Sequence, residues 1–248
     1  MNQTIEMLLN HRSVRKFKEE PISEEVIMKL VEAAQMASTS SFIQAYSIIG
    51  IKDEQRKRRL AELAGEQNYV AENGHFFVFC ADFHRHEIAG EMEAVQVKAA
   101  VESAEKMIVG ITDATLAAQN CAVAAESLGL GICYIGGIRN NIEEVSKELH
   151  LPDHVIPVFG MCVGIPDADP SKKPRLPKEA VYFEETYPDD EFQKEQLEKY
   201  NNIISSYYEE RTNGERTDRW TEQMVSMLSS VKRKHMKSFL RQKGYGVN

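Results

Sequence analysis

Two short basic clusters are the parts of this sequence best suited to chemistry. The first is residues 11–15 (HRSVR) and the second is residues 172–177 (KKPRLP). Arg offers a forked donor that matches phosphate, and Lys offers a compact charge. The chain as a whole is acidic, with a net charge of −8, so two tight basic groups indicate a small phosphorylated ligand. A solvated charged turn is the alternative interpretation of the second cluster.

An apolar run, residues 131–137 (GICYIGG), lies between the two clusters and ends in two glycines. Residues without side chains let a flat ring approach the backbone closely. Phosphate-binding cations and an open backbone together predict a nucleotide-like cofactor, with flavin as the leading candidate. A flexible turn between strand and helix is the other interpretation of Gly136 and Gly137.

The composition excludes several classes of protein. The 248 residues, 42% apolar and 27% charged, suffice for one domain with a sizeable core. A pI near 5.5 argues against nucleic-acid binding, which needs a basic face. The longest apolar stretch, residues 109–130, is interrupted by Asp113 and Glu126, which predicts a buried helix rather than a membrane span. Without a basic and apolar leader, a cytoplasmic location is expected.

No metal site is predicted. The four cysteines stand singly in apolar segments without CxxC spacing, which favours buried structural thiols. The His84-Arg85-His86 segment is expected to be an exposed loop rather than a metal-binding pair.

Periodicity predicts helices and strands that are intermixed along the chain. Ser23 is expected to cap one helix, and Asp53 to open another through Ala64. The remaining helices are predicted over residues 4–10, 85–107, 108–128, 142–149, 200–208 and 221–243. Strands are predicted over residues 46–51, 76–81, 132–135 and 155–163. Together these elements indicate an α+β core packed in layers.

The chain changes character beyond Pro177, where an acidic stretch precedes the last helices. We therefore divide it into a core, residues 1–177, and a C-terminal extension, residues 178–248. In the extension, Met224, Leu228 and Val231 form an apolar stripe that is expected to pack on a partner subunit.

Seven motifs in order resemble the nitroreductase family, in particular its NADPH-linked group with the oxygen-insensitive nitroreductases and the flavin reductases of luminous bacteria. They are residues 11–15, the Ser/Thr loop leading to Phe42 and Gln44, and residues 65–67, 124–131, 134–140, 173–177 and 211–213. They cover nearly the whole chain.

The resemblance implies a nitroreductase-like α+β homodimer with a central, mainly antiparallel sheet flanked by helices. It implies FMN sites at the subunit interface and a C-terminal segment that reaches over the partner. It also implies reduction by NADPH, followed by two-electron ping-pong hydride transfer to nitroaromatics, quinones or free flavin.

The resemblance also places the site residues. Arg12, Ser13, Lys173 and Arg175 would hold the FMN phosphate. Arg15 would stabilise the negative charge of the two-electron-reduced ring and disfavour one-electron chemistry. The other predicted FMN contacts are His11, Gln67, Tyr134, Ile135, Gly136, Gly137 and, from the other subunit, Thr39.

Acceptor and donor contacts are expected further along the chain. Phe42 would line the mouth over the open ring face, although it is equally compatible with an ordinary interface residue. Arg211 and Arg233 would bind the 2′-phosphate of NADPH, and Glu215 in the same region opposes a strong preference. Asn140 would hold the Gly-Gly turn or cap the next helix. No acid, base or nucleophile is required of the protein.

Three other functions are compatible with parts of the pattern. One is an NADPH oxidase or FMN reductase whose main products are hydrogen peroxide or reduced flavin. Another is a non-catalytic FMN-binding module, which would not need arginines for a 2′-phosphate. A purely structural dimerisation protein would leave both basic clusters unexplained.

Overall fold

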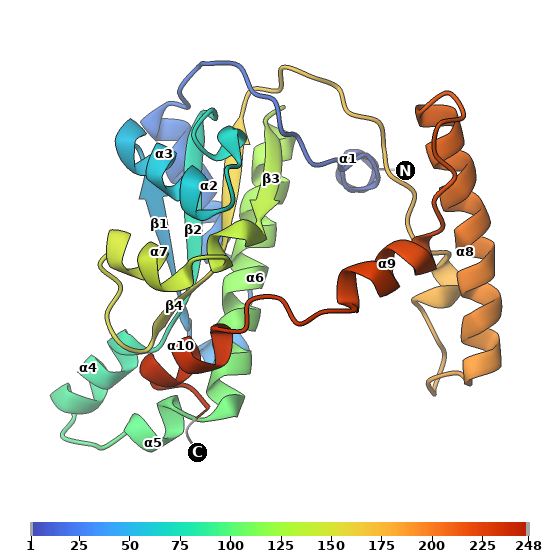
Figure 1. The fold of residues 1–248 in the computed structure, drawn as a ribbon. Helices are drawn as coiled ribbons and strands as arrows, with labels where there is room; N and C mark the ends of the chain where they lie inside the picture. Colours follow the sequence, from blue (N-terminus) through green and yellow to red (C-terminus); the bar gives the residue numbers. More distant parts are fainter. Residues whose placement is uncertain (1, 247–248) are drawn as a thin grey trace. The chain divides into compact units, whose positions relative to one another are not determined.

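The computed structural model describes residues 2–246, which form two compact units, each described here by itself (Figure 1). The first unit contains the chain up to Pro170 and again from Arg233 onward. The second unit is Ser171–Lys232. The division of function between residues 1–177 and 178–248 stays a prediction.

A four-stranded sheet is the centre of the first unit. Its strands are β1 (Tyr46–Ile51), β2 (His75–Asp82), β3 (Gly131–Ile135) and β4 (Val155–Gly164), in the order β1-β2-β4-β3. All three neighbouring pairs are antiparallel. The predicted antiparallel sheet in an α+β fold is therefore confirmed.

Both faces of the sheet are covered at β2, where every residue is buried. The sequence of this strand suits such a position, because it is apolar at every residue from Phe76 to Ala81. Side chains alternate between the faces of a strand. Phe77 and Phe79 accordingly belong to one core cluster, while Phe76 and Val78 belong to the other.

Four helices cover these faces, and three of them begin at polar caps, two of which, Ser23 and Asp53, were expected from the sequence. α2 (Glu24–Gln35) and α6 (Ala104–Ser127) pack on the first face, and α3 (Glu54–Leu63) and α7 (Ile142–Glu148) pack on the second (Figure 1). The side chains of Ser23, Asp53 and Ser103 accept hydrogen bonds from backbone N–H groups in the first turns of α2, α3 and α6. Each cap satisfies a donor that the helix itself leaves unpaired.

Helix α6 is the predicted long apolar helix, and it begins four residues before the expected start, at Ala104. Gly129, just past its end, has φ +76°, a left-handed conformation that suits glycine at a helix terminus. Among the described helices, α6 is the one long and apolar enough to cross a membrane by length and composition. Its Ala114, Ala117, Ala118 and Cys121 are buried in the core of the first unit, as in a core helix.

The first unit also contains shorter helices. They are α1 (Gln3–Leu9), η1 (Ser40–Phe42), η2 (Asn68–Val70), α4 (His84–Met92), α5 (Lys98–Val101), η3 (Gly136–Arg139) and α10 (Met236–Gln242). The expected loop at His84-Arg85-His86 was wrong, because these residues form the start of α4. The Asp82 side chain accepts a hydrogen bond from the His84 backbone N–H at 3.0 Å, which supports the helix start.

The second unit contains η4 (Lys178–Ala180), α8 (Asp190–Arg211) and α9 (Trp220–Leu228). Its small core consists of Tyr200, Ile204 and Tyr208, with Leu176 and Trp220 packed against them.

The predicted continuous helix over residues 221–243 was wrong. α9 ends at Leu228, and α10 starts at Met236, with Arg233 between them at φ +54°. Leu228 and Val231, expected to form part of a buried stripe, are exposed on this chain. By contrast, Phe239 and Tyr245 lie in the core of the first unit.

Candidate functional site

The first basic cluster runs beside strand β3. Ser13 forms a parallel bridge with Ile132, and the Val14 N–H donates to the Ile132 carbonyl at 2.9 Å. Val14 is buried, while Arg12 is half-buried and Arg15 is exposed. The apolar residue thus anchors the segment, and the cations on either side remain available at the surface.

The flanking basic residues have acidic or carbonyl partners. Arg12 pairs with the Asp169 carboxylate at 2.8 Å, and its Nη1 also donates to the Pro170 carbonyl at 3.4 Å. Because the Asp169 side chain is 83% exposed, this ion pair is weak and leaves Arg12 able to bind a ligand anion. His11 lies 2.6 Å from a Glu126 carboxylate oxygen.

Arg15 lies next to a hydrogen-bonded pair from η2 and its flank. The Tyr69 hydroxyl donates to Oε1 of Gln67 at 2.6 Å. Burial raises the pKa of Tyr69, and a hydrogen bond from Arg15 partly opposes this. Arg15 similarly opposes the rise that burial causes in the pKa of Cys133, in β3. Arg15, Gln67 and β3 are therefore neighbours, as the predicted site requires.

The two glycines after β3 serve different purposes. A Cβ atom on Gly137 would lie 2.4 Å from both the Ala64 carbonyl oxygen and Nε2 of Gln67, so only glycine fits. A Cβ atom on Gly136 would meet only the Arg139 guanidinium, at 3.3 Å and beyond. Gly137 is thus required by packing within the chain, whereas Gly136 is half-buried and keeps its backbone accessible to a ligand.

The carbonyl groups at the end of α3 receive three side-chain amides. Gln67 and Asn140 both donate to the Ala64 carbonyl, at 2.8 Å and 3.1 Å, and Asn141 donates to Leu63 at 2.9 Å. These bonds satisfy helix-end acceptors and fix the Gly-Gly turn against α3. Asn140 therefore holds the turn; the residue that precedes α7 is Asn141, and its side chain makes no capping bond there.

The two β3 residues predicted to cover the ring are oriented differently. Tyr134 is half-buried, and its ring meets Phe159 edge-on with centroids 5.3 Å apart. Burial raises the pKa of Tyr134 far above its ordinary value, so the phenol stays neutral. Ile135 is 1% exposed and belongs to the second core cluster, which leaves chiefly its backbone for a ligand.

A pair of arginines, only one of which the sequence assigned, lies beside the Gly-Gly turn. Nε of Arg233 donates to Oδ1 of Asn140 at 2.9 Å. Arg139 donates to the Val158 carbonyl, and burial, with a contribution from Arg233, lowers the pKa of Arg139. Two guanidinium groups that repel each other make a favourable place for an anion. Arg139 belongs to the motif of residues 134–140, but the sequence did not reveal its hydrogen bond to the Val158 carbonyl.

In the second unit, Tyr208 lies between two cations. Lys173 is 5.6 Å from its ring centroid and Arg216 is 4.4 Å from it. Burial raises the pKa of Tyr208, but Lys173 and Arg216 outweigh this and the pKa is lowered. Arg175 donates to the Lys173 carbonyl at 2.9 Å. The two predicted phosphate ligands of this unit are therefore neighbours.

The predicted donor residue Arg211 is at the end of α8, where its guanidinium donates to the Tyr207 hydroxyl at 3.1 Å. The predicted acceptor residue Phe42 is 81% exposed in the first unit. Thr39, the residue directly before η1, is half-buried. Its contact with a second subunit stays a prediction.

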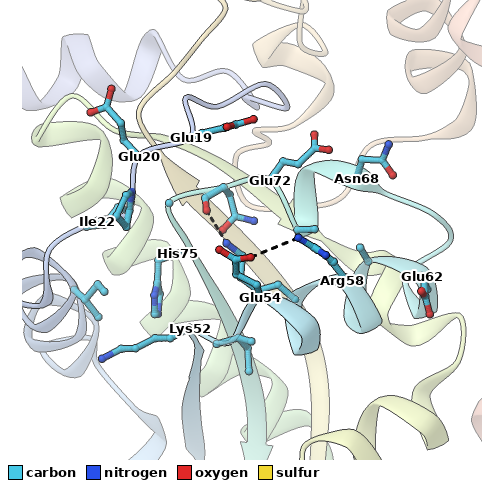
Figure 2. Close-up of a pocket in the computed structure, with 18 of the residues that line it drawn as sticks. Glu19, Glu20, Ile22, Lys52, Glu54, Arg58, Glu62, Asn68, Glu72 and His75 are labelled. Carbon is cyan, nitrogen blue, oxygen red and sulfur yellow. Dashed lines mark hydrogen bonds and ion pairs between the residues drawn. The ribbon is translucent and has the colours of Figure 1, made fainter.

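A hollow of about 970 Å³ is lined by α3, β2 and the loop before α2 (Figure 2). Seven glutamates surround it against three basic side chains, of which Lys52 pairs with Glu24 and Arg58 with Glu54. Such a surface repels phosphate, and it contains none of the predicted site residues. A smaller hollow of about 410 Å³ is lined by three basic residues, among them Arg15, and by three acidic ones, and its Lys16 pairs with Asp167 at 2.6 Å. Among the described residues, no group of three or more His, Cys, Asp or Glu side chains is placed to hold a metal.

The four cysteines are buried free thiols, as predicted. Burial raises the pKa of Cys121 to about 12, and it also raises the pKa values of Cys80, Cys133 and Cys162. Neutral thiols of this kind are poor nucleophiles and metal ligands.

The first unit therefore brings a basic segment, a glycine turn and side-chain amides next to β3 of an α+β fold. Residues 8–165 match the Nitroreductase family, and residues 173–248 match the Nitroreductase family, C-terminal domain. The chain belongs to the nitroreductase family, which confirms the resemblance.

Three similar proteins are particularly informative. The "FMN reductase (NADPH)" of Bacillus subtilis (strain 168) is 49% identical over 250 residues, with 100% of each chain covered. A "CR(VI) reductase" of Pseudomonas sp. (strain G-1) is 45% identical over 97% of this chain and 98% of its own. The solved structure of B. megaterium NfrA1 is 60% identical, with a TM-score of 0.97 over 98% of this chain and 99% of that one.

Proposed function

We propose that this protein is an FMN-dependent NADPH oxidoreductase. It reduces nitroaromatics, quinones or free flavin by two-electron ping-pong hydride transfer. The proposal is supported by three contacts around β3. Ser13 of residues 11–15 bridges to Ile132 in β3, Arg15 acts on Tyr69 beside Gln67, and Gln67 packs against Gly137 in the turn that follows β3. The name of the Bacillus subtilis relative, FMN reductase (NADPH), supports the same donor and cofactor.

The donor groups present fit FMN. Gly136 has no side chain where a ring edge would approach. Arg12 and Ser13 in the first unit, and Lys173 and Arg175 in the second, are each donors suited to a phosphate. When bound, FMN would supply the hydride-accepting chemistry, which side chains cannot provide.

Arg15 supplies fixed positive charge beside β3, and Gly136 supplies a backbone donor. Both act by electrostatic stabilisation, which needs no reorganisation at the moment of reaction. Burial raises the pKa of Tyr134, which makes its phenol a poor proton donor, and the protons would come from water or from the nicotinamide pocket.

The donor would be held by Arg211 and Arg233, since paired arginines favour a 2′-phosphate. Arg139 adds a third guanidinium next to Arg233. The acceptor would stack near the exposed Phe42.

We further infer a homodimer in which Thr39 contributes to the partner's site and the C-terminal extension reaches over the partner. Exposed apolar side chains on two helices support the homodimer. They are Leu8 and Leu9 on α1, and Ile108 and Leu116 on α6. An apolar face of this kind is typical of an interface between subunits. Four free thiols also favour a cytoplasmic location.

The test is an anaerobic titration of the FMN-loaded protein with NADPH and, separately, with NADH, followed by flavin absorbance. Fast bleaching by NADPH and much slower bleaching by NADH is the expected result. An equal response to both would remove Arg211 and Arg233 from donor selection. No bleaching by either would refute the enzyme and favour a non-catalytic FMN-binding module.

A further inference from the structure

The loop that carries Phe42 is attached at both ends to one buried carboxylate. Asp113 of α6 is 0% exposed. Its Oδ1 accepts a hydrogen bond from the Ser40 N–H and its Oδ2 accepts one from the Ala45 N–H, each at 3.0 Å. One side chain therefore fixes the span of residues 40–45, which joins α2 to β1.

The backbone inside this span is held in an unfavourable conformation. Ser41, Phe42 and Gln44 have φ values of 48°, 59° and 53°, in the left-handed region that non-glycine residues seldom adopt. Such conformations persist only when surrounding contacts determine them, and they concentrate at functional sites. Phe42 nevertheless projects outward and is 81% exposed.

A second helix also holds the loop. Nε2 of His86, in α4, lies 2.8 Å from the Ile43 carbonyl oxygen, and since a carbonyl only accepts, the imidazole donates. The loop is thus bound at Ser40, Ile43 and Ala45 by two separate helices. Ile43 packs against the core of the first unit, whereas the side chains of Ser40, Ser41, Phe42 and Gln44 are exposed. Core packing therefore accounts for Ile43 and not for the backbone conformation on either side of it.

We propose that Asp113 is a positioning residue for the acceptor site, acting through Phe42. This inference rests on the proposed function, in which the acceptor stacks near Phe42. A carboxylate in an apolar helix is costly to bury unless its hydrogen bonds are satisfied. Here both oxygen atoms are used on a loop that presents an exposed aromatic ring, Phe42.

The test compares Asp113→Asn with Phe42→Ala in the FMN-loaded protein. An amide offers one acceptor oxygen, so Asp113→Asn leaves either the Ser40 or the Ala45 N–H without its partner. We expect the KM for a nitroaromatic acceptor to rise about tenfold in both variants. The KM for ferricyanide, which needs no aromatic stacking, and the rate of bleaching by NADPH should stay within about twofold of wild type.

Amide hydrogen exchange gives a readout independent of turnover. In Asp113→Asn, amides of residues 40–45 should exchange at least about tenfold faster than in wild type, while those of β2 stay protected. Asn120→Ala is the control, because it removes a different α6 hydrogen bond, to the Ala33 carbonyl at 3.2 Å. That variant should leave both the exchange of residues 40–45 and the nitroaromatic KM unchanged.

The possible outcomes separate the two proposals. An unchanged nitroaromatic KM in Asp113→Asn, with faster exchange at residues 40–45, would overturn the positioning role. Equal losses with ferricyanide and with the nitroaromatic would show a merely structural role and overturn it as well. Failure of NADPH to bleach the wild-type flavin would refute the proposed function, whereas unchanged exchange in Asp113→Asn would refute the attachment of the loop itself.

Discussion

Arg233 and the Ala64 carbonyl are joined through one side chain, Asn140. Nε of Arg233 donates to Oδ1 of Asn140 at 2.9 Å, and Nδ2 of Asn140 donates to the Ala64 carbonyl at 3.1 Å. Gly137 packs against the same carbonyl. The arginine proposed for the electron donor is therefore connected to the turn proposed for the flavin edge.

Replacing Arg233 with Gln should affect the donor and spare the cofactor. We expect the KM for NADPH to rise about tenfold and the KM for NADH to change by less than about twofold, because only NADPH carries the 2′-phosphate. Asn140→Ala should in addition weaken FMN binding, because it removes the amide that holds the turn. Steady-state kinetics and FMN titration measure these effects; a similar rise in both KM values for Arg233→Gln would contradict the assignment.

The two glycines of the turn should respond differently to the same change. Gly137→Ala places a methyl group 2.4 Å from Ala64 and Gln67 atoms and should lower the free energy of unfolding of the apoprotein by about 1–3 kcal/mol. Gly136→Ala meets only a flexible guanidinium, so stability should change by less than about 1 kcal/mol. It should nonetheless weaken FMN binding about tenfold or more, since the methyl group covers the backbone donor. Equal FMN affinity in Gly136→Ala and wild type would show that no ring approaches there.

Most of the secondary structure was predictable because its signals are local. The four strands are apolar and rich in β-branched and aromatic residues, and the caps at Ser23 and Asp53 have direct chemical causes. The break in the last helix was not predicted. Arg233 lies in it, and its hydrogen-bond partner Asn140 is 93 positions away in the sequence, so the local pattern does not reveal this contact.

The parts of the site that depend on residue type were predictable from motifs. The parts that depend on contacts between distant residues were not. The basic segment and the glycine turn were found from residue types. Gly137 packs against the end of α3, and Gly136 does not, which distinguishes the two glycines. The side chain of Ile135 is buried in the core. Neither fact is visible in the residue types. Asp113 gave a signal, a single carboxylate within an apolar helix, but its loop partners are 68 and 73 residues away.

Arg15→Gln should lower the two-electron potential of the bound flavin. The variant removes a fixed positive charge beside β3. A reduced, negatively charged ring would therefore lose the stabilisation that this charge provides. We expect a fall of about 30–60 mV, equivalent to about 1.4–3 kcal/mol for two electrons, with more one-electron-reduced flavin during titration. Spectroelectrochemistry measures both, with Lys18→Gln as a surface-charge control. An unchanged potential and unchanged one-electron yield would overturn the role of Arg15.

His75 should make the fold sensitive to acid. Burial, with smaller effects of Lys57 and Lys52, lowers the pKa of His75 from 6.5 to about 4. Between these values the unfolded chain binds the proton and the folded chain does not. Stability should therefore fall as the pH drops from about 6.5 to 4, by up to about 3 kcal/mol from this residue. Denaturant unfolding across this range should show a weaker pH dependence in His75→Gln, while His150→Gln, at an exposed position, should behave as wild type.

His154 should hold the C-terminal residues in place. Its ring nitrogens lie 2.6 Å and 3.3 Å from carboxylate oxygens of Glu87 and Glu102, and its carbonyl accepts from the Tyr245 hydroxyl at 2.6 Å. The buried His154 ring is thus bound on both of its nitrogen atoms, and its backbone carbonyl holds Tyr245.

Glu87→Gln replaces the carboxylate that contacts Nδ1 of the buried His154 at 2.6 Å and should lower the free energy of unfolding by about 2 kcal/mol, because a hydrogen bond to a carboxylate at a buried ring is lost. Amides of residues 243–246 should exchange faster, since the Gly246 N–H donates to the Glu102 carbonyl at 3.0 Å beside the same ring. Glu144→Gln is the matched control, because it breaks an exposed pair with Lys147 and should have no measurable effect. Equal stability of the two variants would show that the buried His154 pairs contribute no more than a surface ion pair.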